Sequence, residues 1–113
     1  MAHKVFVTFF FEKKLKNLRR KYPRIFQDYK ELLEELEKNP YVGDRLRGCA
    51  GPIFKIRMAS MDMGRGKSGG FRIIYWVQKK EKIIYLLTLY PKSERENIEV
   101  SEVNEILSKT GLS

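Results

Sequence analysis

The chain has 113 residues, of which 42% are hydrophobic and 33% charged, and its formal net charge is +9. This length fits a single domain over residues 1–113, and the composition excludes an intrinsically disordered protein. The apolar runs are too short for a membrane helix, and no secretory signal pattern is present. One cysteine, Cys49, excludes an internal disulfide, so we expect a cytoplasmic protein without a membrane partner.

The N-terminal third is predicted to form a strand followed by a helical hairpin. Residues 4–8 are rich in β-branched and aromatic side chains, which is typical of a strand. Phe11, Leu15 and Leu18 recur at helical spacing, and a second helix is predicted over residues 24–38. Because few residues join them, the two helices are expected to lie antiparallel.

Beyond residue 40 the apolar pattern indicates strands. Residues 41–52 are rich in glycine and include a short edge strand near Leu46. Residues 54–58 alternate apolar and basic side chains, which predicts a strand with one buried and one basic face. Residues 71–77 are predicted to form another strand. Residues 83–90 are almost continuously apolar, which predicts a central strand covered on both faces.

The C-terminal segment is predicted to form a last helix. Ser101 is a suitable N-cap for it, and Gly111 a suitable end. The predicted fold class is therefore α+β. An N-terminal strand and a helical hairpin pack on a curved, mostly antiparallel sheet, with a short C-terminal helix.

The net charge is concentrated in the middle of the chain. Residues 45–92 carry eleven lysines and arginines and two acidic residues, which gives +9. The remaining twelve basic and twelve acidic residues balance. This localisation favours a polyanion partner, with nucleic acid the first candidate, over a basic surface that is merely solvated.

Several other chemistries lack the residues they need. The sequence GRGKS at residues 64–68 is similar to a phosphate-binding P-loop, but Met61 occupies a required glycine position and a strand follows in place of a helix. His3 is the only histidine and Cys49 the only cysteine, and acidic residues are sparse in the basic window. We therefore expect no metal, no cofactor and no histidine-based catalysis.

A basic, metal-free site remains. Lys55 and Arg57 share a strand face, Arg72 begins the neighbouring strand, and Lys92 follows the next one. Strand ends on one side of a sheet could gather these cations around an RNA phosphate, where they would stabilise the transition state of attack by the neighbouring 2′-hydroxyl. A lysine could be the base, since clustered cations lower a lysine pKa. A splayed base could stack on Tyr75, Trp76, Tyr85 or Tyr90, although we expect most aromatic side chains to be core.

Three segments carry a resemblance to a known family: FKIR at residues 54–57, GKSGGFRIIY at residues 66–75, and LLTLYPK at residues 86–92. They resemble the RelE/ParE superfamily of bacterial toxins. The glycine loop before the arginine strand is most similar to the HigB-like branch, and the resemblance covers about residues 5–98. It implies a RelE-like fold and the toxin of a type II toxin–antitoxin pair. Members similar to RelE cleave mRNA in the ribosomal A site, without metal, through 2′-hydroxyl attack.

The resemblance also implies roles for individual residues. By position, the catalytic residues would be Arg72, Lys92, Lys55 and Arg57. We expect further RNA contacts from five residues: Arg65, Lys67, Tyr90, Arg95 and Arg47. Well-known members have a base-stacking tyrosine near the position of Glu99 and an arginine at the position of Ser93, so the stacking role here is vacant or falls to Tyr90. The implied partners are a cognate antitoxin of helix-turn-helix type and the ribosome with its mRNA.

Two alternatives remain open from the sequence. ParE-like relatives share the fold but inhibit DNA gyrase, and the same basic face could serve a non-catalytic RNA-binding module. ParE-like relatives lack the full basic set. The presence of Lys55, Arg57, Arg72 and Lys92 therefore favours the endoribonuclease.

Overall fold

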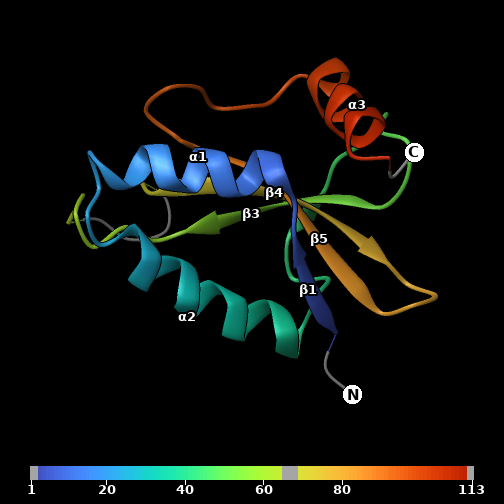
Figure 1. The fold of residues 1–113 in the computed structure, drawn as a ribbon, viewed down its shortest axis with the longest axis horizontal. Coiled ribbons are helices and arrows are strands. Elements are labelled where there is room, and N and C mark those ends of the chain that lie inside the picture. Colours follow the sequence, from blue (N-terminus) through green and yellow to red (C-terminus); the bar gives the residue numbers. More distant parts are fainter. Residues whose placement is uncertain (1–2, 65–68, 112–113) are drawn as a thin grey trace.

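The computed structural model describes residues 3–64 and 69–111 of the chain. Figure 1 shows the elements in their order along this part of the chain: β1 Lys4–Val7, α1 Phe9–Arg19, α2 Ile25–Lys38, β2 Asp44–Arg45, β3 Ile53–Met58, β4 Phe71–Gln78, β5 Ile83–Pro91 and α3 Val100–Lys109. This order confirms the predicted α+β fold. None of these described helices is long and apolar enough to cross a lipid bilayer.

The strands form one mixed sheet in the order β1-β5-β4-β3-β2. β1 pairs parallel with β5, and the other neighbours are antiparallel, as predicted for a mostly antiparallel sheet. The edge strand expected near Leu46 is β2, which ends one residue earlier. Leu46 extends this pairing, because its backbone N–H donates to the carbonyl of Ile53 at 2.8 Å.

Residues 83–90 were predicted to be the central strand and to be covered on both faces. The first prediction is wrong, and the second is confirmed. β5 lies between β1 and β4, so it is an interior strand, but the middle of the sheet is β4. Ile84, Leu86 and Leu89 belong to one buried cluster, whereas Leu87 and Tyr90 belong to a second. The apolar run therefore reports burial of both faces, and burial of both faces does not specify a place in the strand order.

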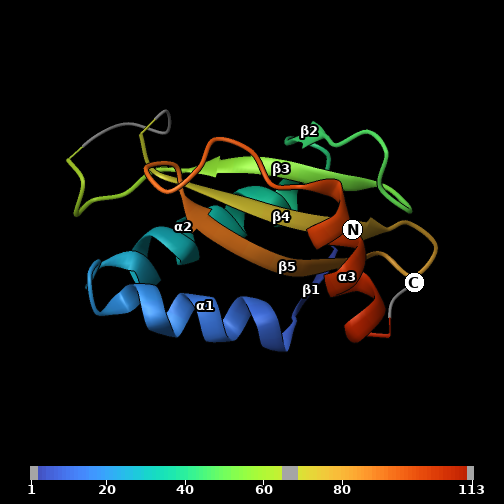
Figure 2. The ribbon, with the colours of Figure 1, turned by 90° about the horizontal axis from the view of Figure 1, so that it is seen from above.

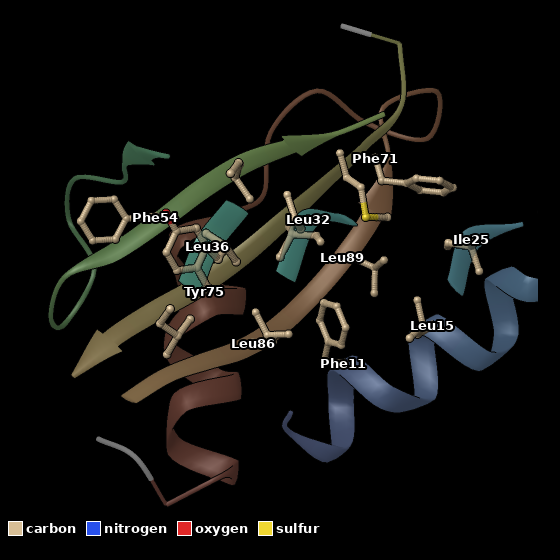
Figure 3. Packing of buried hydrophobic residues seen from close by; sticks show 14 of the residues in the cluster. Phe11, Leu15, Ile25, Leu32, Leu36, Phe54, Phe71, Tyr75, Leu86 and Leu89 are labelled. Carbon is tan, nitrogen blue, oxygen red and sulfur yellow. The ribbon is translucent and has the colours of Figure 1, made fainter. Parts of the chain in front are cut away.

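Helices α1 and α2 cover one face of the sheet. Phe11 and Leu15 from α1 and Ile25, Leu32 and Leu36 from α2 point toward the strands (Figure 3). These residues recur four or seven positions apart on each helix, which places them on a single face. The two helices and the sheet thus enclose the larger buried cluster.

Thr8 joins the first strand to this layer. Its hydroxyl accepts the N–H of Phe11 at 3.3 Å, which makes it the N-cap of α1. The same hydroxyl donates to the carbonyl of Leu86 on β5 at 2.6 Å. The start of α1 is therefore fixed to an interior strand of the sheet.

Helix α3 packs on the opposite face. Val103, Ile106 and Leu107 bury their side chains against Ile74 and Leu87. The N-cap expected at Ser101 is wrong. Glu99 occupies that position with an extended backbone, and its carbonyl accepts the N–H groups of Glu102 and Val103. Ser101 therefore lies inside the first turn. The predicted end of the helix at Gly111 is confirmed by the left-handed φ of that residue, +76°.

The two faces of α1 give a test of how the core stabilises the fold. Phe11 is fully buried and packs on Tyr29 with a ring-centroid distance of 5.6 Å, whereas Phe9 is 71% exposed. We expect Phe11→Ala to lower the free energy of unfolding by about 3–5 kcal/mol. Phe9→Ala on the same helix should change it by less than about 0.5 kcal/mol. Urea denaturation measures both, and equal losses would contradict the packing.

A second test concerns the entry into β4. A Cβ added at Gly70 would lie 2.0 Å from the backbone carbonyl oxygen of Met58, so the end of β3 leaves no room for a side chain. Gly70→Ala should therefore cost about 2–4 kcal/mol of unfolding free energy. At Gly64, whose surroundings are open and whose φ is +59°, alanine should cost about 1 kcal/mol from backbone strain alone. Thermal denaturation of the two variants compares these values.

Candidate functional site

A row of three residues crosses the sheet on the face that α3 also occupies. Arg57 on β3 is directly opposite Arg72 on β4, and Arg72 is directly opposite Tyr90 on β5. Directly opposite residues of antiparallel strands project to the same face with their Cβ atoms about 5 Å apart. The sheet register therefore places two of the predicted catalytic arginines side by side and next to the predicted stacking tyrosine.

The two predicted catalytic lysines come from the same region. Lys55 lies two residues before Arg57, on the same face of β3, and its ammonium donates to the side-chain oxygen of Asn97 at 3.0 Å. Lys92 directly follows β5, and its backbone N–H donates to the carbonyl of Gly70 at 3.1 Å. That bond continues the β4–β5 pairing beyond Phe71 and Pro91, so the backbone of Lys92 lies at the end of the sheet where β4 begins, next to Arg72.

Burial differs strongly along this row. Arg57 is exposed, Lys55 and Lys92 are half-buried, and Arg72 is only 2% exposed. The Arg72 guanidinium donates to the carbonyl of Phe71 at 3.2 Å. Arginines on directly opposite positions of two strands can together hold an anion such as a phosphate through charge-assisted hydrogen bonds.

Tyr90 is completely buried in this conformation. Its hydroxyl has no hydrogen-bond partner in the described residues. Burial raises the pKa of Tyr90, and the charges of Arg95 and Arg72 oppose that shift. The Arg95 guanidinium lies over the Tyr90 ring, 4.7 Å from its centroid. The ring is therefore not presented to a base in the conformation described.

The other aromatic side chains that could stack a base are structural here. Tyr75 is fully buried, and burial raises its pKa to about 12. Its ring stacks on Phe54, and its hydroxyl accepts the N–H of Gly43 at 3.1 Å. Trp76 stacks on Tyr85 at the edge of the second buried cluster. These contacts agree with the expectation that most of the aromatic side chains belong to the core.

The remaining candidate RNA contacts fall in different places. Arg95 lies beside the row, but its guanidinium is occupied by Glu102 through two hydrogen bonds of 2.7 and 2.9 Å. Arg47 is exposed beyond β2, near the start of β3, so it lies at the opposite end of that strand from Arg57. The structure therefore does not bring Arg47 to the row. Arg65 and Lys67 lie outside the described residues.

Sequence reasoning missed two residues that contact the predicted set, Asn97 and Glu102. Asn97 binds Lys55 and Glu102 binds Arg95. Both contacts involve the loop between β5 and α3, which folds back over the sheet. Such contacts leave no helical or strand periodicity in the sequence. Nothing in the sequence pattern could have identified them. Among residues 3–64 and 69–111, no three His, Cys, Asp or Glu side chains gather as a group that could hold a metal ion.

Solved structures with the same fold include three with sequence identities of 20–22%. A double arginine-to-alanine variant of the E. coli toxin RelE in the free state has a TM-score of 0.56 at 20% identity, over 98% of this chain and 96% of that one. The isolated E. coli RelE toxin has a TM-score of 0.57 at 21% identity, and the match covers 96% of this chain and 98% of that one. For the RelBE toxin–antitoxin complex of Mycobacterium tuberculosis, the TM-score is 0.58 at 22% identity, and the match covers 80% of this chain and 99% of that one.

The family of the chain follows from its sequence as a whole. Residues 3–111 match the family model described as the RelE toxin of the RelE/RelB toxin–antitoxin system. This match extends beyond the resemblance expected over residues 5–98, and the shared fold agrees with it. The chain therefore belongs to the RelE family, the toxins of a type II toxin–antitoxin system.

Proposed function

We propose that this RelE-family toxin is a ribosome-dependent mRNA endonuclease that cuts in the A site by metal-free attack of a 2′-hydroxyl. The observation that carries the proposal is the row of Arg57, Arg72 and Tyr90 across three neighbouring strands, with Lys55 and Lys92 next to it. This row offers several cations and no carboxylate in the strands that form it. Such a set suits a phosphodiester better than a neutral or cationic substrate. We further propose that the chain lies in the HigB-like branch, on the strength of its glycine loop.

The reaction needs only groups that RNA and this site supply. The 2′-oxygen attacks the adjacent phosphorus and loses its proton to a base, while the bond from phosphorus to the 5′-oxygen breaks. The leaving 5′-oxygen takes up a proton, so the products are a 2′,3′-cyclic phosphate and a 5′-hydroxyl. Negative charge grows on the phosphoryl oxygens in the transition state. Cations fixed beside them therefore accelerate the step more than they strengthen substrate binding.

The positions of the residues suggest how these tasks are divided. Arg72 and Arg57 would bind the scissile phosphate, since they lie opposite each other on the same face. Lys55 and Lys92 would exchange protons with the 2′- and 5′-oxygens. Tyr90 would stack a base. We also propose that Arg65, Lys67 and Arg95 contact the RNA backbone.

We propose that a cognate antitoxin of helix-turn-helix type neutralises the toxin in the cell. The Mycobacterium tuberculosis structure of the same fold is a toxin–antitoxin complex. The net charge of +9 on this chain favours a partner whose acidic segments cover the basic face. A neighbouring reading frame that encodes a small DNA-binding protein with an acidic segment would support this partner.

Replacing Arg72 tests the catalytic proposal. We expect Arg72→Ala to lower the rate of cleavage of ribosome-bound mRNA by about a hundredfold or more, because it removes a cation from the charge that develops in the transition state. Arg72→Lys should lose less, since it keeps the charge but not the bidentate geometry. Arg20→Ala, which removes an exposed arginine at the end of α1, is the matched control and should cleave normally. Circular dichroism would show that all three variants are folded.

The chemistry of the new ends provides an independent test. Fragments from a 2′-hydroxyl attack should carry 5′-hydroxyl ends, so polynucleotide kinase should label them without prior phosphatase treatment. If wild-type protein leaves ribosome-bound mRNA intact and instead alters DNA supercoiling by gyrase, the ParE-like alternative is correct. If it binds RNA with a steep salt dependence and produces no new ends, it is a binding module.

A further inference from the structure

Residues 93–99, here called the strap, follow Lys92 at the end of β5 and lead to α3 across the face of the sheet that carries the row. Figure 1 shows the segment rising above the strands before it enters α3, on the side opposite α2. Figure 2, from above, shows it crossing the sheet toward α3. The strap is not a strand of the sheet. It is held in place mainly by side chains, which distinguishes it from its neighbours β3, β4 and β5.

The first holding contact joins Arg95 of the strap to Glu102 in the first turn of α3. The two guanidinium nitrogens donate to the two carboxylate oxygens at 2.7 and 2.9 Å. This geometry fixes the plane of the guanidinium, and Arg95 lies over the Tyr90 ring. The pair therefore keeps the strap on top of the one aromatic side chain of the row.

A second contact joins the strap to β3. The Asn97 side-chain oxygen accepts from the Lys55 ammonium at 3.0 Å, so a lysine proposed to serve catalysis is engaged by the strap. Ile98 is 9% exposed and packs in the buried cluster that also contains Tyr90. Between them, Arg95 and Asn97 occupy two residues of the candidate site.

The buried state of the site conflicts with the function proposed for it. Arg72 is 2% exposed and Tyr90 is not exposed at all, so RNA has no access to either side chain in this conformation. Something must move before a phosphate or a base can reach them. The strands are joined by backbone ladders, whereas the strap is held by two polar side-chain contacts, the buried side chain of Ile98 and one local backbone hydrogen bond from Glu94 to Pro91. Of the segments around the row, the strap can therefore move away from the sheet with the fewest contacts broken.

The Tyr90 hydroxyl favours opening. It is buried without a hydrogen-bond partner in the described residues, and a buried, unsatisfied polar group is costly. Removal of the strap would let water or RNA satisfy it. The closed state thus contains one unfavourable element, which narrows the free-energy gap to the open state.

We propose that the strap is an intramolecular inhibitor of the candidate site, and that the Arg95–Glu102 pair is the latch that keeps it closed. Opening exposes Tyr90 and frees Lys55, and RNA binds only the open form. This inference rests on the proposed function, because it treats the row as the RNA site. Glu102 does not touch RNA in this scheme. It acts on the site through Arg95.

The test weakens the latch in two steps. Glu102→Gln removes the negative charge of the side chain, and Glu102→Ala removes both the charge and the hydrogen-bonding oxygens. Amide hydrogen exchange of the strap should become about two- to fivefold faster in the alanine variant, and the glutamine variant should lie between it and wild type. Binding of a short 2′-O-methylated RNA, which cannot be cleaved, should tighten by the same factor. The matched controls are Glu105→Gln and Glu105→Ala, which break the exposed pair of Glu105 with Lys109 on the same helix and should change neither measurement.

Each result decides one part of the inference. Unchanged exchange in the strap, or the same change in the Glu105 variants, would show that Glu102 is no latch. Faster exchange with unchanged or weaker RNA binding would show that the strap does not inhibit the site. The proposed function fails separately, if ribosome-bound mRNA stays intact with wild type and Glu102→Ala alike. In that case tighter binding of the RNA probe to Glu102→Ala would still support the latch.

Discussion

The β4–β5 pairing is the constraint on which both cores and the candidate site depend. Its strands are buried on both faces, so helices α1 and α2 can pack on one side and α3 on the other. A shift of β4 by one residue would turn the side chain of Arg72 toward the cluster under α1 and α2, which disfavours that register. The same register aligns Arg72 with Tyr90, and the β3–β4 pairing aligns Arg57 with Arg72. The fold and the arrangement of the row therefore depend on the same two strand pairings.

This alignment places charged side chains inside the sheet. Arg72 lies in the interior, directly opposite Arg57. A sheet that served only stability would have apolar side chains at both positions, as it has at Ile56 and Ile73 on the opposite face. The two arginines are therefore not explained by packing alone, which agrees with the RNA-binding role proposed for the row.

Periodicity predicted most of the fold, because burial on a helix or strand repeats at short range. Helix α2, for example, ends at Lys38, where the sequence pattern places its end. The errors arise where local patterns carry no information. Burial of both faces could not show which of β4 and β5 lies in the middle of the sheet. Ser101 precedes an apolar run and was therefore predicted to be the N-cap of the last helix, but the backbone is already helical there and the extended N-cap residue is Glu99. For the site, alternation along β3 placed Lys55 and Arg57 on one face, but the burial of Arg72 depends on distant segments. A charge count could not separate Arg47 from the residues of the row.

Helix α3 can serve both the core and the strap because its two contacts are on different parts of its surface. Val103, Ile106 and Leu107 anchor it to the sheet, whereas Glu102 faces the strap from the first turn. A carboxylate near a helix N-terminus is also favoured by the helix dipole, and the pKa of Glu102 is lowered mainly by its hydrogen bonds to Arg95. If Arg95 is released, the apolar anchors remain. Opening of the strap is then a local change that leaves α3 folded and docked, so access to the site can be regulated without unfolding the domain.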